Sequence, residues 1–528
     1  MRWLRKTPWI LFGGFLFFYF CLFLVRPCLG PIDDHVLLNT LQVGKRLHFF
    51  IVPQEGRFYP LDAQEYNLVS LIAPAPLLYY LFNACQFLAL IFLFFSILKK
   101  LAPRSRLVLP SLVYLALLPG FTAAFFRLQV PERDSLFFFS LFLLFYLRHL
   151  ERPRYLDLFC GLLSANVALY YKEPGFLMLG AFAFLHFLTE KEAALRQKAF
   201  DLLLLLSSLI FAGIYYWVAF RHIGAHRYGT TSFPPLFLTL KNLLFFALSD
   251  PLVTLLLPFF LGFRFLRMKQ GKTRFHPVHD SLLIGSLLYF LAYLALKIQT
   301  YHYLLPIYAF LLPSLLYFFR FYRPWRMEKA AIALLSMLFL NSSLIGLHSL
   351  SNTKYIPHNY NLMLNQLVRD LPPEGKTSIF LDGVNPASGN EMYQSLGRFL
   401  NFHGIGNERF DLKSDLPPDN LVFAKRDPDS PYAVFKGAID RVKRGDYLIV
   451  TPHTGKDSGP EYLEALGRDY DLLYRTRSPF AFPDLSLKSA LKELALVSMR
   501  QFKMDATLGH LVNENRLHRP DYYLYRKR

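Results

Sequence analysis

Residues 77–97, LLYYLFNACQFLALIFLFFSI, contain no charged side chain and are followed by Lys99 and Lys100. The hydrocarbon core of a bilayer is about 30 Å thick, so a helix needs about 20 apolar residues to cross it. A cationic pair at one end is typical of a span that stops at the cytoplasmic face. This stretch therefore predicts a helix that crosses a membrane.

Ten further apolar stretches have the same character, so we expect about eleven spans. Hydrophobic residues make up 53% of the 528 residues and charged residues only 18%, which is not the composition of an ordinary soluble protein. The other stretches are residues 9–25, 107–126, 135–148, 155–171, 174–189, 200–220, 251–266, 281–297, 303–319 and 330–348.

Positive charge follows the loops between these stretches. The formal net charge is +20, but after residue 350 there are 25 Lys and Arg against 22 Asp and Glu, so most of the excess belongs to the apolar part. With the N-terminus in the cytoplasm, the N-terminal segment and five inner loops hold 22 of the 33 Lys and Arg of that part, as the positive-inside rule requires. The charge therefore indicates membrane topology, and we expect no nucleic-acid partner.

This topology divides the chain into two parts. An odd number of spans puts everything after Leu350 on the outer side. The apolar stretch Leu236–Leu248 would export a basic cluster if it were a span, so we interpret it as a re-entrant or interfacial helix. The transmembrane part is then residues 1–349, with outer loops at 26–76, 127–134, 171–174, 221–250 and 298–302.

Residues 350–528 predict a separate α/β domain outside the cytoplasm. Proline pairs separate short strand-like runs such as Ser378–Leu381 and Tyr447–Val450, and a helical pattern follows at Lys488–Met499. The four cysteines lie in or beside apolar stretches, so we expect neither a disulfide framework nor a zinc site. Without disulfides or convincing glycosylation sequons, the domain favours the periplasmic side of a bacterial inner membrane over the endoplasmic reticulum.

Unusual polar residues gather in the outer loops. The first loop carries Asp33 and Asp34 at the start of an amphipathic stretch, and the second carries Glu132-Arg133-Asp134. A later turn holds Lys172-Glu173, and another holds His302 between two tyrosines. Ionisable residues this close to hydrocarbon are costly, which favours a functional site.

Each of these features also has a purely structural interpretation. Asp33 could cap the helix that follows it, and Glu132 and Asp134 could cap a span or pair with neighbouring arginines. Lys172 and Glu173 could extend to the interface, and His302 could belong to an aromatic belt. These residues are all expected on one side of the membrane, and this favours a catalytic site over the separate structural interpretations.

Forming a glycosidic bond requires a base for the acceptor hydroxyl and positive charge for a departing phosphate. A carboxylate of the first loop can act as the base. Arg57, Arg133, Lys172 and His302 can bind the phosphate, or a divalent ion such as Mg²⁺ or Mn²⁺ held by Glu132 and Asp134 can stabilise it.

The order of these motifs resembles the GT-C superfamily of polyprenyl-phosphate-sugar-dependent glycosyltransferases, which includes protein O-mannosyltransferases and aminoarabinose transferases. That family has an acidic pair after the first span, a second acidic site in the next outer loop and a Lys-bearing turn between later spans. The matching residues here are Asp33-Asp34, Gly44, Pro53, Gly56-Arg57-Phe58-Tyr59-Pro60, Glu132-Arg133-Asp134, Lys172-Glu173-Pro174-Gly175 and Tyr303-Leu304-Leu305-Pro306.

The resemblance implies an inverting glycosyltransferase with Asp33 as the catalytic base and Asp34 as its supporting neighbour. It also implies a polyprenyl-phosphate-linked sugar as donor and a lipid, glycan or protein as acceptor. Two departures, Asp34 in place of the commoner Glu and Glu173 after Lys172, leave the sugar and the acceptor open.

Two other functions are compatible with the spans. A transporter or flippase of lipid-linked sugars would share the basic inner loops, although such proteins usually carry ionisable residues at mid-membrane. A membrane anchor for an outer binding domain would explain residues 350–528 but not the acidic outer loops.

Overall fold

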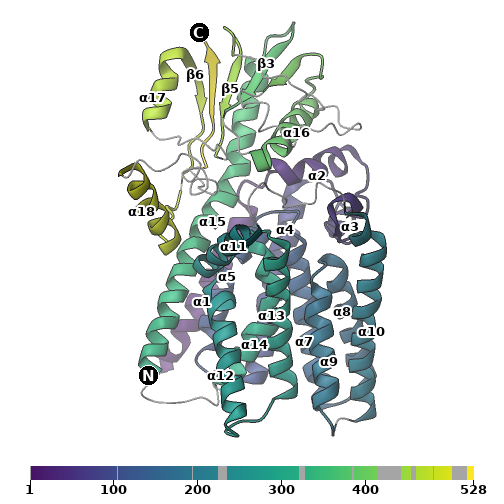
Figure 1. Ribbon diagram of the computed structural model, residues 1–528. Helices are drawn as coiled ribbons and strands as arrows, with labels where there is room; N and C mark the ends of the chain where they lie inside the picture. The colour runs from purple at the N-terminus through teal and green to yellow at the C-terminus, as the bar shows by residue number, and fades with distance from the viewer. Residues whose placement is uncertain are drawn as a thin grey trace.

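The chain folds into a bundle of long helices with a five-stranded sheet domain at one end (Figure 1). The computed structural model describes residues 2–103, 105–192, 194–223, 235–319, 328–382, 386–413, 442–452, 460–479, 481–501 and 520–528. The middle of the expected outer loop 221–250, residues 224–234, lies outside these ranges.

Each of the eleven apolar stretches is helical, either as one helix or as two consecutive helical segments. The helices of the bundle are α1 (Arg2–Leu24), α4 (Pro76–Leu101), α5 (Val108–Leu117), α6 (Pro119–Phe125), α7 (Pro131–Glu151), α8 (Tyr155–Tyr171), α9 (Gly175–Thr189), α10 (Leu195–Val218), α11 (Pro235–Ser249), α12 (Leu257–Lys269), α13 (Pro277–Leu296), α14 (Tyr308–Phe319) and α15 (Glu328–Asp370).

Fewer of these helices are long and apolar enough to cross a membrane by themselves. Among the described residues four qualify, namely Pro76–Leu101, Leu195–His222, Pro277–Leu296 and Tyr301–Phe319, and up to six if each of two bent pairs is one span. Others are shortened or carry charge, as in α7, whose first turn contains Glu132 and Asp134. An α-helical, multi-pass membrane protein is therefore confirmed, and the number eleven stays a prediction.

One bent pair contains the helix expected to be re-entrant or interfacial. α11 meets the segment Leu252–Lys269 at 111°. Pro251 and a π-helical turn at Leu252–Leu256 interrupt the regular hydrogen bonds there. The Asp250 carboxylate accepts a 2.6 Å hydrogen bond from the Tyr308 hydroxyl, which fixes the bend against α14.

Close packing inside the bundle depends on glycines. A Cβ placed on Gly346 of α15 would lie 1.8 Å from the Leu117 carbonyl oxygen at the end of α5, and one on Gly285 of α13 would lie 2.5 Å from the Met178 carbonyl oxygen of α9. Small residues let helix backbones approach this closely in a membrane. Large apolar side chains instead cover the outside of the bundle, as at Phe17, Phe159 and Leu209, and this surface suits lipid.

Short elements of the first expected outer loop lie at the end of the bundle that faces the sheet domain (Figure 1). They are the 3₁₀ turns Ile32–Asp34, Leu41–Val43 and Pro53–Glu55, with α2 (His35–Asn39), β1 (Ile51–Val52), β2 (Arg57–Phe58) and α3 (Gln64–Val69). β1 and β2 pair antiparallel, with Ile51 opposite Phe58.

The sheet domain has the strand order β4-β3-β5-β7-β6. β3 is parallel to β4 and β5, whereas β7 is antiparallel to β5 and β6. Alternating side chains cover both faces, because Ile379 and Leu381 pack toward α15 and α16 while Phe380 packs in a second cluster. The elements are β3 (Thr377–Leu381), α16 (Pro386–Phe402), β4 (Phe410–Lys413), β5 (Tyr447–Val450), α17 (Pro460–Asp469), β6 (Tyr470–Arg475), α18 (Leu487–Gln501) and β7 (Tyr523–Lys527).

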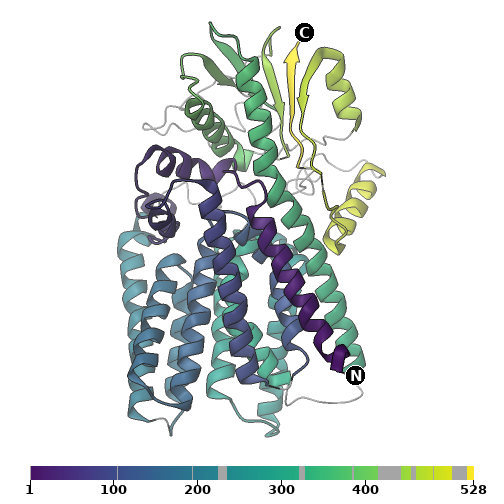
Figure 2. The same ribbon diagram turned by 180° about the vertical axis from the view of Figure 1, so that it is seen from behind.

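Helix α15 connects the two parts without a break. It runs for 43 residues from the bundle into the sheet domain, so the expected boundary at residues 349/350 lies in the middle of a helix. Figure 2 shows α15 passing beside α1 and reaching the sheet at its far end. The bundle and the sheet domain are therefore joined by one continuous helix.

The glycine contact between α15 and α5 makes a testable prediction. Gly346→Ala should lower the thermal unfolding midpoint of the purified protein, because overpacking costs about 1–3 kcal/mol and exceeds the roughly 1 kcal/mol by which alanine favours helix. Gly213→Ala in α10, where a Cβ would have no atom within 4 Å, is the matched control and should leave the midpoint unchanged or raise it. Equal midpoints for the two variants would contradict the close contact.

Candidate functional site

The two acidic residues of the first outer loop face different surroundings. Asp33 keeps 38% of its side chain exposed and pairs with the Arg127 guanidinium, which is exposed to the same extent. Asp34 is buried, and its Oδ2 accepts a 2.7 Å hydrogen bond from the Gly30 amide. Neither side chain caps α2. Asp33 is therefore the carboxylate that a substrate can reach, and Asp34 closes the turn beneath it.

Burial changes the protonation of Asp34. Loss of water raises the pKa of its carboxyl to about 7, and the neighbouring Asp33 adds to the rise, whereas the Gly30 amide and Arg127 oppose it. Asp34 is thus poised between its neutral and charged forms near neutral pH.

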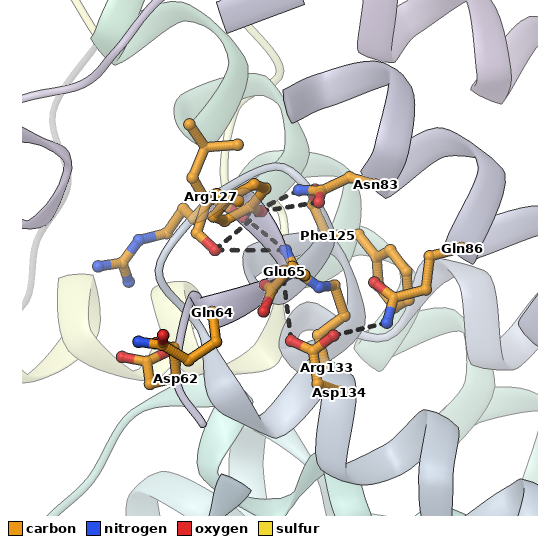
Figure 3. A network of polar contacts seen from close by, with 11 residues as sticks. Asp62, Gln64, Glu65, Asn83, Gln86, Phe125, Arg127, Arg133 and Asp134 are labelled. Atoms are coloured by element: carbon orange, nitrogen blue, oxygen red, sulfur yellow. Dashed lines mark hydrogen bonds and ion pairs between the residues drawn. The ribbon is translucent and has the colours of Figure 1, made fainter. Parts of the chain in front are cut away.

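A closed network surrounds Arg133 (Figure 3). Its guanidinium is fully buried and bonds to Glu65 at 2.8 Å and to Asp134 at 3.0 Å. It also donates to the carbonyl oxygens of Arg127 and Leu128. A buried cation needs such partners. Arg133 therefore connects the second outer loop to α3, and all of its hydrogen bonds are to other groups of the protein.

A second ion pair lies beside this network. The Lys172 ammonium group is 2.8 Å from the Glu132 carboxylate, and both side chains are buried. The rings of Tyr59 and Tyr303 also face the ammonium group, at 4.9 and 5.0 Å from their centres. Glu173 accepts a 2.9 Å hydrogen bond from the Phe58 amide, which attaches the first outer loop to the Lys-bearing turn.

Two carboxyls in this layer were not among the predicted site residues, namely Glu65, which pairs with Arg133, and Asp62. Asp62 is buried, and burial raises its pKa to about 8 against the attraction of Lys172, with Glu132 and Asp134 adding to the rise. The motif at residues 56–60 predicts a functional loop, but it does not predict that Asp62 belongs to the site. Asp62 stands alone in sequence, and only folding brings it to the other carboxylates.

Positive charge converges on His302. This histidine lies within electrostatic range of Arg127, Lys172 and Arg57, which come from three different outer loops. Arg57 also lies over the Tyr59 ring, 5.2 Å from its centre. Of the four predicted phosphate-binding residues, Arg57 and Lys172 therefore face the same Tyr59 ring. Both lie within electrostatic range of His302, as does Arg127.

The predicted metal ligands do not share a coordination site. Asp134 uses one oxygen for the Gln86 amide, at 2.6 Å, and the other for Arg133. Glu132 faces the Lys172 ammonium group instead. In the part of the chain that the structure describes, no group of three or more His, Cys, Asp or Glu side chains could hold a metal ion. A divalent ion held by Glu132 and Asp134 stays a prediction.

The sheet domain contacts the turn that presents Asp33. Ile32 has a φ of +73°, a conformation that is strained for a β-branched residue, and its amide donates a 3.1 Å hydrogen bond to the hydroxyl of Ser395 in α16. In α15, Asn361 donates to the Leu29 carbonyl oxygen at 2.8 Å, and Pro357 packs on Gly30. The domain thus holds the turn in its strained form.

Comparison with known proteins gives a distant structural likeness. No family model and no curated protein sequence matches the chain. Its fold is similar to the crystal structure of ArnT from Cupriavidus metallidurans bound to undecaprenyl phosphate, with a TM-score of 0.45 and 12% identity over 90% of this chain and 97% of that one. It is also similar to the archaeal oligosaccharyltransferase AglB from Archaeoglobus fulgidus in complex with an inhibitory peptide and a dolichol-phosphate, with a TM-score of 0.39 and 10% identity over 85% of this chain and 70% of that one.

Both solved structures are GT-C membrane glycosyltransferases, the superfamily that the loop motifs resemble. At these identities and TM-scores the likeness assigns no role to any residue.

The buried carboxyl of Asp34 predicts a pH-dependent stability. Its pKa is about 7 in the folded chain, against about 3.9 in an unfolded one. Between these values the folded state holds a proton that the unfolded state has lost, so the free energy of unfolding falls as the pH rises. Asp34→Asn imitates the neutral form and should unfold at a higher temperature than the wild type at about pH 8.

The same difference should disappear below about pH 4, where both states hold the proton. Thermal unfolding of the purified protein across this pH range measures it. Glu55→Gln removes an exposed carboxyl in the same loop and is the control. A variant that is no more stable than the wild type at the higher pH would contradict a neutral, buried Asp34.

The contact between Ser395 and Ile32 predicts a local loosening. Ser395→Ala should speed hydrogen exchange of the amides of residues 32–34 several-fold, because a hydrogen bond worth about 1 kcal/mol no longer holds the strained turn. Ser395→Thr keeps the hydroxyl and should restore protection. Exchange that is the same in the wild type and in Ser395→Ala would show that α16 does not hold the turn.

Proposed function

We propose that this chain is a glycosyltransferase that moves a sugar from a polyprenyl-phosphate-linked donor to an acceptor hydroxyl on the outer face of the membrane. The observation that carries the proposal is the pairing of the partly exposed Asp33 with Arg127. Two further cations, Arg57 and Lys172, face the Tyr59 ring in the same group of loops. A base beside a cationic site is what the reaction requires.

In this reaction the acceptor oxygen attacks the anomeric carbon of the sugar while Asp33 takes the hydroxyl proton. The bond between the anomeric carbon and the phosphate oxygen breaks, and the polyprenyl phosphate leaves with its charge raised from one negative unit to two. Arg127, Lys172 and Arg57 stabilise that added charge. Direct displacement inverts the anomeric configuration.

The other site residues have supporting roles. Asp34 fixes the turn through the Gly30 amide, and Arg133 fixes the second outer loop through Glu65. The charge distribution favours an N-terminus in the cytoplasm and a site on the opposite face of the membrane. The lack of expected disulfides and glycosylation sequons favours the periplasmic face of a bacterial inner membrane. The donor sugar is a hexose or a pentose, and the acceptor is a lipid, a glycan or a protein.

Asp33→Asn tests the proposal directly. With the protein in membranes and a set of polyprenyl-phosphate sugars as donors, the substitution should lower the transfer rate by about 10²–10⁴-fold, the usual contribution of a general base. Glu55→Gln, in the same loop, should transfer at the wild-type rate. Transfer by a folded Asp33→Asn protein at the wild-type rate would remove Asp33 as the base, and a wild type inactive with every donor would favour a transporter or an anchor.

A further inference from the structure

Helix α18 of the sheet domain has an apolar face that no described part of the chain covers. Leu487, Leu491, Leu494 and Val497 recur at helical spacing and lie on one side of the helix. Their side chains are exposed by 56%, 43%, 63% and 56%. A water-soluble domain seldom exposes a continuous apolar stripe of this kind, so the stripe requires an explanation.

The first turn of α18 is attached to the bundle at the level where the spans begin. The Leu487 amide donates a 2.9 Å hydrogen bond to the side chain of Asn341, which lies inside the apolar stretch 330–348 of α15. The ammonium group of Lys488 donates a 2.6 Å hydrogen bond to the hydroxyl of Tyr301, the first residue of the candidate span Tyr301–Phe319. These two contacts hold the first turn of α18 against α15 and against the start of the span Tyr301–Phe319.

Lys488 itself is suited to such a boundary. Its side chain is buried, and its ammonium group lies 4.5 Å from the centre of the Phe245 ring in α11 and 4.7 Å from that of Tyr301. Aromatic faces stabilise a cation that has lost water. The apolar stem of a lysine commonly lies along nonpolar surface at a membrane interface.

The apolar stripe also continues onto helices that face lipid. α18 contacts α11, where Leu240 and Leu244 are exposed by 55% and 59%. On α15, Leu340 is exposed by 59%, one residue from the Asn341 that anchors α18. In Figure 1, α18 lies beside α15, away from the sheet and close to the height of α11.

We propose that α18 lies in the headgroup region of the outer leaflet, with Leu487, Leu491, Leu494 and Val497 in contact with acyl chains. The partner of this surface is the lipid bilayer itself, and the domain after α15 is membrane-attached at two places, through α15 and through α18. An amphipathic helix in the interface plane buries its apolar face about 5–10 Å into this region. The inference rests on the fold and does not depend on glycosyl transfer.

Depth-dependent fluorescence quenching of the full chain tests this placement. The four native cysteines are replaced, and a single cysteine at Leu494 or at Glu493 carries an environment-sensitive fluorophore, with the protein in lipid nanodiscs. Glu493 is exposed and lies off the apolar stripe, so Glu493→Cys is the matched control. If the cysteine-free chain does not fold, the native chain labelled without the added cysteine provides the background to subtract.

Lipids with a nitroxide near the headgroup end of the acyl chain should quench the label at residue 494 several-fold more than the label at residue 493. Iodide in the aqueous phase should show the opposite order. Stronger iodide quenching at residue 494 would put the stripe in water and overturn the proposal. Protection of residue 494 from both quenchers would mean that protein covers it, such as a second copy of the chain, and would overturn the proposal equally.

Discussion

Charged side chains that lose water must find partners of opposite charge, and the layer between the outer loops and the bundle depends on this constraint. Arg133 is fully buried and satisfies it with Glu65 and Asp134, and Lys172 satisfies it with Glu132. These pairs join α7 to the first outer loop and to the turn between α8 and α9. Loops that are far apart in sequence are thereby held in one layer.

In this layer some charges hold the fold and others can meet a substrate, and Lys172, which is paired with Glu132, is proposed to do both. Arg133 and Asp34 are buried with their bonding groups directed at protein. Asp33 and Arg127 each keep more than a third of the side chain exposed. A catalytic base must be accessible to the substrate and must also be held in a fixed position. Hydrogen bonds from α15 and α16 hold the turn around Ile32, which carries Asp33. The sheet domain is in this way part of the proposed site.

The sequence predicted the helices of the bundle and the strands β3 and β5 well, because long uncharged runs and short β-branched runs carry a clear local signal. It also grouped the outer-loop acids correctly on one end of the bundle. It did not separate the exposed Asp33 from the buried Asp34, since adjacent residues share every local signal and differ only in tertiary surroundings. Asp62 was missed for a similar reason: its partners are distant in sequence.

The continuity of α15 could not be read from composition either. The change from apolar to polar residues after position 349 predicted a boundary, whereas the helix continues because its later turns pack on the sheet domain. Whether a helix continues beyond the membrane depends on which parts of the chain pack against its later turns. That covering comes from α16, β6 and β7, which follow later in the chain.

The most direct measurement compares binding of a polyprenyl monophosphate with binding of the matching polyprenyl alcohol, by native mass spectrometry of the protein in lipid nanodiscs. If Arg127, Lys172 and Arg57 receive a lipid phosphate, the monophosphate binds at least tenfold more tightly, since one charged hydrogen bond contributes about 1.5–3 kcal/mol. Arg127→Gln then reduces this preference, whereas Arg221→Gln, which removes an exposed cation on a neighbouring loop, does not. Equal binding of the phosphate and the alcohol by the wild type would contradict a phosphate site in the outer loops.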